Sequence, residues 1–510
     1  MALPLSPLRH ATACALLSGL LLVLSFPHAH LDLLAWVALA PLLAALVYRR
    51  SRRRNFFLGY LTGVVFLAGT CPWIYHVMRH FGHLGAAAAA GVLAAFVLGL
   101  AVHFGLFSLA VGELARRWQV RALWAAPLAW VAMEWLRAWV PFGGFPWNLL
   151  GYAVAPRVGW IQPAAYAGIY GVSFLLAGVS ALVAWCWLAP SRRRAAALAA
   201  VAVVLTLAEL GAQGLPPAPV SERVLLVQAN LPQQEEFDPR WLEHHADVLA
   251  DLEQRTREAA VEHAAGRPAL ILWPEVPVSI YFNHDPVLRA RLLQLAQATR
   301  SNLLVGIVDY RPGEGGKLHP RNSAVLLSPA GSLLGQYDKI HLVPFGEYVP
   351  WPGGRGFLGR LVEEVSDFRP GEDFTLMPAE QGPLAVFICF EAVFPSLVRE
   401  FAGRGARVLV NISNDGWYGS SAAGAQHLNM ARVRAVETRR FLLRATNTGI
   451  TAVVDPLGRI AARAPRDTRT VLVAGYAPRE GASFYVRYGD WLPAVCALAS
   501  AALVGRKLWM

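Results

Sequence analysis

Charged side chains are scarce in this chain of 510 residues: Asp, Glu, Lys and Arg make up 16% of it, while 55% is hydrophobic. Soluble domains carry roughly a quarter of charged residues, so we do not expect a wholly soluble protein. Acidic residues are scarcest in 1–215, which hold 4 against 15 Arg, whereas 216–488 are neutral overall. The net charge of +12 therefore lies almost entirely in the apolar part. This distribution predicts membrane topology and not a nucleic-acid-binding face.

Lysine is nearly absent, with three residues among the 46 basic ones. Since Arg supplies positive charge elsewhere, a retained Lys indicates a need for a compact ammonium group with an adjustable pKa. Lys507 flanks an apolar run, and Lys317 lies in a Gly-rich loop. Lys339 is therefore a candidate site residue, and the alternative is a solvated strand residue.

Cysteine is also rare, and only one of the five, Cys389, falls within 216–488. An internal disulfide scaffold is therefore excluded there. Cys389 ends the apolar strand predicted from Leu384 onward, and a strand end places a side chain at the rim of a sheet, where α/β sites form. Taken alone, this residue could equally be a buried structural Cys.

Long apolar runs are abundant. Seven lie near 11–27, 31–48, 56–77, 86–115, 122–140, 164–190 and 195–213, and an eighth near 490–505. A spanning helix needs ~20 apolar residues, because backbone polar groups find no partner in lipid. We therefore predict an α-helical membrane bundle of about eight spans.

The basic clusters predict the orientation of these spans. They follow the second, fourth, sixth and eighth runs, at 49–54, 116–121, 192–194 and 506–507. The positive-inside rule then places both termini in the cytoplasm and 216–488 on the outer side of the membrane. We interpret the first run as a retained span, because no small-x-small cleavage site follows it.

The segment 216–488 is predicted to fold as a complete α/β domain, between a seven-span region at 1–215 and a C-terminal helix with its tail at 489–510. Short β-rich runs alternate with helical stretches. The predicted strands are 224–230, 269–273, 303–310, 323–327, 384–389, 408–412 and 451–454, the predicted helices are 241–265, 286–298 and 426–443, and a tight turn is predicted at 328–331.

Glu275 directly follows the apolar strand that ends at Trp273, with Pro274 breaking the strand between them. Partial burial at a sheet end raises the pKa of a carboxyl group toward that of a general base. An exposed loop acid is the alternative for this residue alone.

Three motifs together resemble the Glu–Lys–Cys triad of the nitrilase, or carbon–nitrogen hydrolase, superfamily. They are Trp273-Pro274-Glu275, Tyr337-Asp338-Lys339 and Cys389-Phe390-Glu391. The longer segments 339–350, 411–419, 426–437 and 447–449, and the eight-span plan, resemble the apolipoprotein N-acyltransferases. Two positions depart from the pattern of that family, because Phe390 and Phe237 stand where Tyr and Trp are expected. Both keep an aromatic ring and lose a polar group.

The resemblance implies an αββα sandwich and a ping-pong acyl transfer. Cys389 would take a fatty acyl group from a membrane phospholipid as a thioester, with Glu275 as base and Lys339 facing the oxyanion. The N-terminal amine of an apolipoprotein's diacylglyceryl-cysteine would then accept the acyl group. Glu347 would support Lys339, and Glu391 and Phe390 would be further site residues. The implied location is the bacterial inner membrane with a periplasmic catalytic domain, without cofactor or nucleic acid.

Other residues are weaker candidates. Asn414, Asp415, Trp417 and Phe237 are expected to shape the pocket, although turn chemistry also explains an Asn-Asp-Gly sequence. Aromatic residues in 141–163, chiefly Phe145 and Trp147, and the stretch 351–357 are expected to reach the membrane interface. Three His at 76, 80 and 83 have helical spacing, but no acid or Cys completes a metal-ligand set, so we predict no metal site.

Two rival functions are kept open. One is a membrane-tethered amidase of the same superfamily that uses water in place of the lipoprotein amine. The other is a transporter with an outer binding domain, which would favour paired polar residues at mid-membrane. The predicted spans are mostly Ala, Leu and Val, which argues against the transporter.

Overall fold

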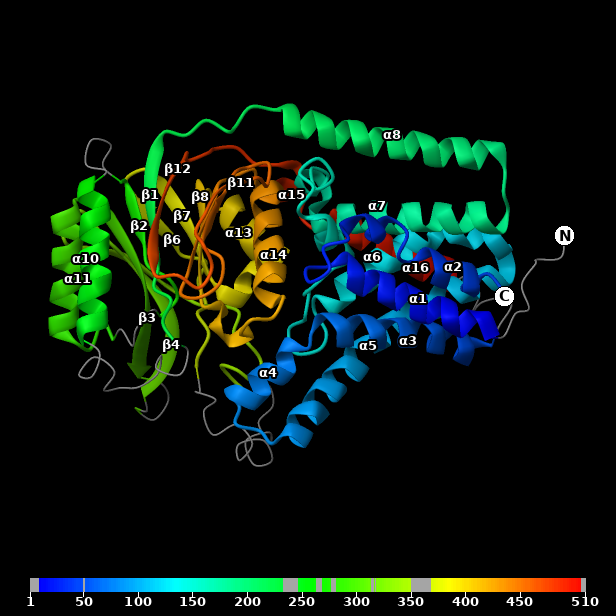
Figure 1. Cartoon of the computed structure of the whole chain (residues 1–510), viewed down its shortest axis with the longest axis horizontal. Helices are drawn as coiled ribbons and strands as arrows, with labels where there is room; N and C mark the ends of the chain where they lie inside the picture. Colours follow the sequence, from blue (N-terminus) through cyan, green and yellow to red (C-terminus); the bar gives the residue numbers. More distant parts are fainter. Residues whose placement is uncertain are drawn as a thin grey trace.

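A computed structural model describes residues 9–48, 51–232, 246–262, 268–276, 281–312, 316, 318–349 and 368–505. An α/β part built on two sheets lies beside a part built of apolar helices (Figure 1).

Two six-stranded sheets form the centre of the α/β part. Their strand orders are β12-β1-β2-β3-β4-β5 and β11-β10-β9-β8-β7-β6. In the first sheet β1, β2 and β3 are parallel and β3, β4 and β5 antiparallel, and in the second β7, β8 and β9 are parallel. The bounds are β1 Glu222–Gln228, β2 Leu270–Leu272, β3 Asn302–Pro312, β4 Leu318–Leu327, β5 Leu333–Asp338, β6 Leu376–Ala379, β7 Gly382–Ile388, β8 Val408–Ser413, β9 Leu442–Thr446, β10 Ala452–Val454, β11 Ile460–Arg463 and β12 Thr470–Tyr476.

Helices cover the outer face of each sheet. The pair α10 (Ala246–Glu262) and α11 (Pro286–Thr299) covers the first, and α13 (Pro395–Gly403) and α14 (Ala423–Thr438) cover the second (Figure 1). The predicted αββα sandwich is therefore confirmed. The central parallel strands β2, β8 and β9 are buried along their whole length, which explains why apolar residues predominate in them.

All eight predicted apolar runs contain helix. The bounds are α1 Arg9–Ser25, η1 Asp32–Trp36, α2 Ala40–Leu46, α3 Arg52–Thr70, α4 Trp73–His80, α5 Ala86–Trp118, η2 Gln119–Ala125, α6 Ala126–Arg137, η3 Leu150–Val154, α7 Ala164–Leu188, α8 Arg192–Gly214, α15 Phe484–Tyr488 and α16 Trp491–Gly505. Within the described residues three helical stretches are long and apolar enough to cross a membrane, or four if the bent pair α3–α4 counts as one. The structure thus supports a membrane protein but does not by itself establish eight spans.

One predicted element is wrong at its end. The helix predicted to run to residue 443 ends at Thr438, and β9 begins at Leu442. Arg439 adopts a left-handed conformation with φ +58°, which ends the helix, and the apolar residues that follow are buried between β8 and β10. Five strands (β5, β6, β9, β11 and β12) were not predicted. The tight turn is confirmed, since the Gly331 N–H donates to the Ser328 carbonyl between β4 and β5.

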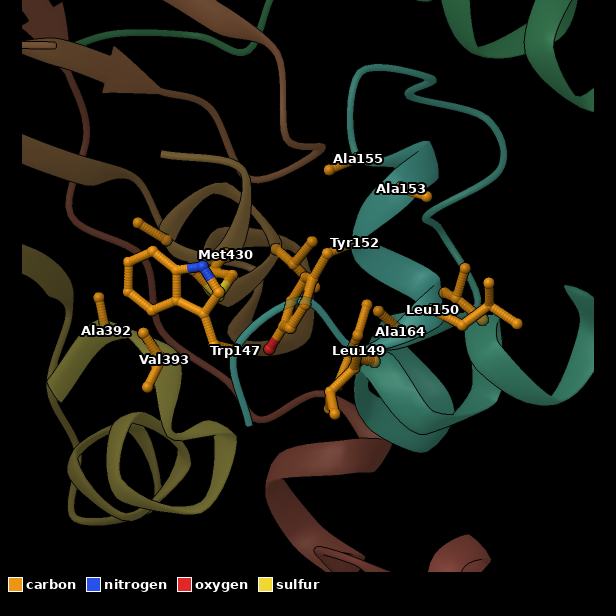
Figure 2. Close-up of a cluster of buried hydrophobic side chains, with 14 of the residues drawn as sticks. Trp147, Leu149, Leu150, Tyr152, Ala153, Ala155, Ala164, Ala392, Val393 and Met430 are labelled. Atoms are coloured by element: carbon orange, nitrogen blue, oxygen red, sulfur yellow. The ribbon is translucent and has the colours of Figure 1, made fainter. Parts of the chain in front are cut away.

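The two parts share a buried junction on the α14 side of the sandwich. Trp147, which precedes η3, lies beside Ala392, Val393 and Met430 of the α/β part (Figure 2). Its indole N–H donates to Gln426 Oε1 at 2.7 Å, and Gln426 in turn donates to the Thr70 carbonyl at 3.1 Å. The second sheet is therefore packed, through α14, against the apolar helices.

Candidate active site

The three predicted triad residues all follow strand ends and meet between the two sheets. Glu275 and Lys339 come after β2 and β5 of the first sheet, and Cys389 comes directly after β7 of the second. Cys389 adopts φ +50°, a left-handed conformation that non-glycine residues seldom take and that is concentrated at functional sites. This turn leads from β7 into the short helix η7 (Cys389–Val393) and leaves the Cys389 side chain at the sheet rim.

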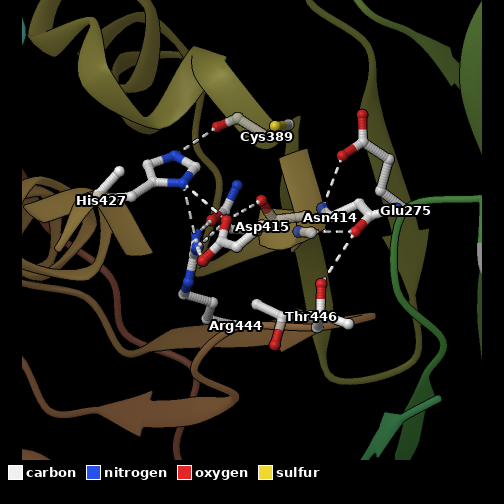
Figure 3. Close-up of polar contacts among 12 residues, drawn as sticks. Glu275, Cys389, Asn414, Asp415, His427, Arg444 and Thr446 are labelled. Carbon is white, nitrogen blue, oxygen red and sulfur yellow. Dashed lines mark hydrogen bonds and ion pairs between the residues drawn. The ribbon is translucent and has the colours of Figure 1, made fainter. Parts of the chain in front are cut away.

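Lys339 lies between two carboxylates. Its Nζ donates to Glu347 Oε1 at 2.8 Å and lies 3.6 Å from Glu275 Oε1. The side-chain amide of Asn322 on β4 donates to both carboxylates, at 2.8 Å to Glu275 and 3.0 Å to Glu347. The backbone N–H of Asn414 donates to the other oxygen of Glu275 at 2.8 Å (Figure 3). Both carboxyl groups are thus fixed in orientation around a single ammonium group.

Backbone packing also fixes Glu275. Gly306 on β3 lies so close that a Cβ added there would come within 2.9 Å of the Glu275 Cα and closer still to the neighbouring backbone. Only glycine permits this approach, so Gly306 determines how deeply Glu275 enters the site. Neither Gly306 nor Asn322 was identified from the sequence.

Burial controls the charges of the triad, since Lys339 is 2% exposed and Glu275 and Cys389 are 5% exposed. Burial opposes the charge of Lys339, but Glu347 and Glu275 outweigh it and raise its pKa above 10.5. Burial, followed by the charge of Glu347, raises the pKa of Glu275 despite the opposite effect of Lys339. Lys339 therefore stays a cation, and Glu275 is poised as a proton acceptor.

The Cys389 thiol is protonated at rest. Burial and then the negative charge of Glu275 raise its pKa, and the positive charge of Lys339 offsets them only in part. A thiolate therefore forms only as its proton moves to a base during attack. This supports general-base activation by Glu275 over a preformed thiolate.

Glu391 joins the Lys339 loop to the Cys389 turn. One of its oxygens accepts from Tyr337 Oη and from the backbone N–H groups of Ile340 and His341, at 2.8–3.0 Å. The other accepts from the Ile388 N–H at 2.7 Å. Both oxygens have donors, so Glu391 holds the Lys339 loop and the Cys389 turn in position relative to each other.

Aromatic rings form a wall beside the nucleophile. The Phe390 ring lies 6.4 Å from Phe145 and 6.5 Å from Trp147, both from the loop before η3, and 5.2 Å from Phe394. That loop is held from the helical part, because Glu134 on α6 accepts the Leu150 N–H at 2.6 Å. The structure thus brings three predicted residues, Phe145, Trp147 and Phe390, into one largely buried apolar cluster.

A buried polar cluster of Asp415, His427 and Arg444 lies next to the backbone of Cys389 (Figure 3). Asp415 accepts from Arg444 Nη2 at 2.8 and 2.9 Å, and its Oδ1 lies 2.9 Å from His427 Nδ1. The other ring nitrogen of His427, Nε2, lies 3.0 Å from the Cys389 carbonyl oxygen. Asp415 was a predicted pocket residue, but the cluster it forms was not foreseen. A charged residue inside the apolar strand Leu442-Leu443-Arg444-Ala445 was the signal, since a buried charge requires a partner.

The remaining candidate residues lie in the turn after β8 or outside the described residues. Trp417 packs on Phe81 at 4.9 Å, near a cavity of about 330 Å³ lined by α4, by the turn after β8 and by residues 448–449 and 466–467. Within the described part of the chain, no three His, Cys, Asp or Glu residues are arranged to hold a metal ion. Phe237 and residues 351–357 lie outside the described residues.

Comparison with known proteins agrees with this architecture. Residues 223–481 match the carbon–nitrogen hydrolase family, and residues 18–182 match the apolipoprotein N-acyltransferase N-terminal domain. The fold and site therefore define a nitrilase-type catalytic domain joined to apolar helices.

Relatives that match nearly the whole chain define the family more closely. An apolipoprotein N-acyltransferase of Geobacter metallireducens is 39% identical over 96% of this chain and 94% of its own length. One of Methylococcus capsulatus is 35% identical over 95% and 94%. Among solved structures, an amidase from Nesterenkonia sp. is 20% identical, covering 54% of this chain and 96% of its own, with a TM-score of 0.38. The chain belongs to the apolipoprotein N-acyltransferase family.

Proposed function

We propose that this protein transfers a fatty acyl group from a membrane phospholipid, through a thioester on Cys389, to the N-terminal amine of lipoproteins. The observation that carries the proposal is the junction of a Glu–Lys–Cys site with an aromatic wall supplied by the helical part. A hydrolase of small soluble amides has no need of such a wall, whereas a lipid acyl chain requires apolar surface next to the nucleophile.

In the first half-reaction Cys389 Sγ attacks the ester carbonyl while Glu275 takes the thiol proton. Lys339 stabilises the negative charge that develops on the carbonyl oxygen, because it stays cationic. The tetrahedral intermediate collapses to the thioester, and Glu275 returns the proton to the departing oxygen of the lysophospholipid. The thiol hydrogen thus ends on the leaving group, and the carboxylate is regenerated.

In the second half-reaction the amine of the diacylglyceryl-cysteine attacks the thioester. Glu275 takes a proton from the nitrogen, an amide bond forms, and the carbon–sulfur bond breaks. The sulfur then leaves as a thiolate next to Lys339 and recovers the proton from Glu275. Because one carboxylate serves both steps, loss of Glu275 slows both half-reactions.

The proposal extends to topology. Residues 1–215 would supply seven spans, 216–488 the periplasmic catalytic domain and 489–510 the eighth span, in the inner membrane with both termini cytoplasmic. The basic clusters after alternate apolar runs and the helices found in all eight runs support this arrangement. We also propose Glu275, Lys339 and Cys389 as catalytic residues, with Glu347 holding Lys339 and Phe390, Phe145 and Trp147 lining the acyl path.

Intact mass of the protein purified from membranes tests the thioester. Wild type incubated with phospholipid should carry a fatty-acyl adduct that hydroxylamine removes, and Cys389→Ala should carry none. Glu275→Gln keeps the nucleophile and should acylate at least ~100-fold more slowly. An unmodified wild-type protein that hydrolyses small amides would instead favour the membrane-tethered amidase.

A further inference from the structure

His427 lies in the second turn of α14, and its side chain contacts the backbone of Cys389. Its Nε2 is 3.0 Å from the carbonyl oxygen of Cys389, and the ring is completely buried. A carbonyl oxygen only accepts hydrogen bonds, so Nε2 must carry a proton and donate to it. The backbone of the residue that bears the nucleophile is thus tied to a helix of the outer layer.

The opposite side of the imidazole is fixed whatever its charge. Nδ1 lies 2.9 Å from Asp415 Oδ1 and 3.2 Å from Arg444 Nη2. A protonated Nδ1 donates to Asp415, and an unprotonated Nδ1 accepts from Arg444. In both states Nε2 keeps its proton and donates it to the Cys389 carbonyl.

The groups that hold His427 are themselves buried and hydrogen-bonded. Arg444 is fully buried in β9, and it bonds both oxygens of Asp415 as well as the side-chain oxygen of Asn411 on β8. Ser413 Oγ donates to Asp415 at 3.0 Å. Breaking such a buried ion pair leaves an uncompensated charge, so the cluster has one arrangement.

Cys389 needs this support because its backbone is strained. A left-handed φ of +50° is unfavourable for a residue with a Cβ, and it persists only where the surroundings fix it. Glu391 fixes the turn through the Ile388 N–H before Cys389, and His427 fixes it through the Cys389 carbonyl itself. The two bonds hold the peptide on both sides of the nucleophile.

We propose that His427, held by Asp415 and Arg444, is a positioning residue that keeps Cys389 in the left-handed conformation from which its sulfur reaches both Glu275 and the ester carbonyl. This inference rests on the proposed role of Cys389 as the nucleophile. It does not depend on the identity of the acyl donor.

Two variants that both carry a side-chain amide, His427→Gln and His427→Asn, test the proposal on the full-length protein in detergent. In His427→Gln the amide nitrogen takes the place of Nε2 and can still donate to Cys389, whereas in His427→Asn the shorter side chain reaches only the Asp415 side. The probe is p-nitrophenyl acetate, whose burst of p-nitrophenolate reports acylation of Cys389 without lipid. We expect a burst rate within ~10-fold of wild type for Gln, and a loss of roughly 100-fold for Asn, as for a nucleophile displaced by about 1 Å.

Structural and positioning roles are separated by three controls. The midpoint of thermal unfolding should be similar for the two variants, and the loss should fall on the rate constant rather than on KM. The same Asn and Gln replacements at His103, a buried histidine of α5 outside the site, should show no such difference. Equal burst rates for His427→Asn and His427→Gln, or a faster Asn variant, would overturn the proposal. A normal wild-type burst without acylation by phospholipid would reject the donor and leave the positioning role standing.

Discussion

Tyr337 donates its phenolic hydrogen to Glu391 over 2.8 Å, and this bond joins the two sheets beside the nucleophile. Tyr337 belongs to β5 of the first sheet, whereas Glu391 follows β7 of the second, and both side chains are fully buried. Lys339 lies two residues after Tyr337, and Cys389 two residues before Glu391. The distance between the ammonium group and the sulfur is therefore set through this pair.

Replacing Glu391 by Gln should destabilise the protein and slow acylation together. Donors surround both carboxylate oxygens, so the amide NH₂ of Gln must face a donor on one side. An unpaired buried group of this kind costs about 1–3 kcal/mol. Tyr337→Phe removes only one of four donors and should cost about 1 kcal/mol or less. Thermal unfolding in detergent, with the burst assay, checks the order. A larger loss of stability and burst rate in Tyr337→Phe than in Glu391→Gln would contradict the role given to Glu391.

His341 should make the protein sensitive to mild acid. Burial, followed by the charge of Lys339, lowers its pKa from 6.5 to about 4. Below pH 6.5 the unfolded chain takes up a proton that the folded protein does not bind. Stability from this group is therefore complete above pH 6.5 and is lost as the pH falls toward 4, by up to about 1.4 kcal/mol per pH unit.

The variant His341→Phe tests this assignment. A Phe ring can keep the contact with Phe394, whose centroid lies 3.7 Å from that of His341. The unfolding midpoint of the variant should fall less than that of wild type between pH 7 and pH 5. Parallel curves for the two proteins would show that another group titrates in this range.

The sequence pattern was sufficient for an α/β fold, and the short motifs around Glu275, Lys339 and Cys389 were sufficient to select these three residues as candidates and to indicate the αββα arrangement by resemblance. It was insufficient for the surroundings of these residues. Asn322, Gly306 and Arg444 act through contacts between segments distant in the chain, and single-residue patterns carry no information on such pairs. The end of α14 was misjudged because the apolar residues 441–443 fit a helix and a buried strand equally well.

Phe390 should tolerate Tyr but not Ala. Its ring packs against Phe145, Trp147 and Phe394, and these contacts survive the addition of a hydroxyl group. We expect Phe390→Tyr to acylate within roughly 3-fold of wild type, because the wall is kept. Phe390→Ala opens a cavity, costs about 3–5 kcal/mol and should raise KM for phospholipid more than for p-nitrophenyl acetate. Equal effects on both esters would mean that the ring only supports Cys389.

The rate of thioester formation should rise with pH through the pKa of Glu275 and then stay level. Burial and Glu347 place this pKa above 4.5, and the base must be ionised to accept the thiol proton. No falling limb is expected up to pH 9, because the pKa of Lys339 lies above 10.5 and its charge is constant over that range. Single-turnover acylation, followed by intact mass from pH 4 to 9, measures this profile.

Two variants assign the rising limb. Glu275→Gln should remove it and slow acylation at least ~100-fold, since no base remains beside the sulfur. Glu347→Gln should instead move the limb to lower pH, because the negative charge of Glu347 is one of the causes that raise the pKa of Glu275. Removal of the rising limb and its displacement to lower pH are different results, so the two variants distinguish the base from the neighbouring carboxylate. A limb that persists unchanged in Glu275→Gln would transfer the role of base to another residue.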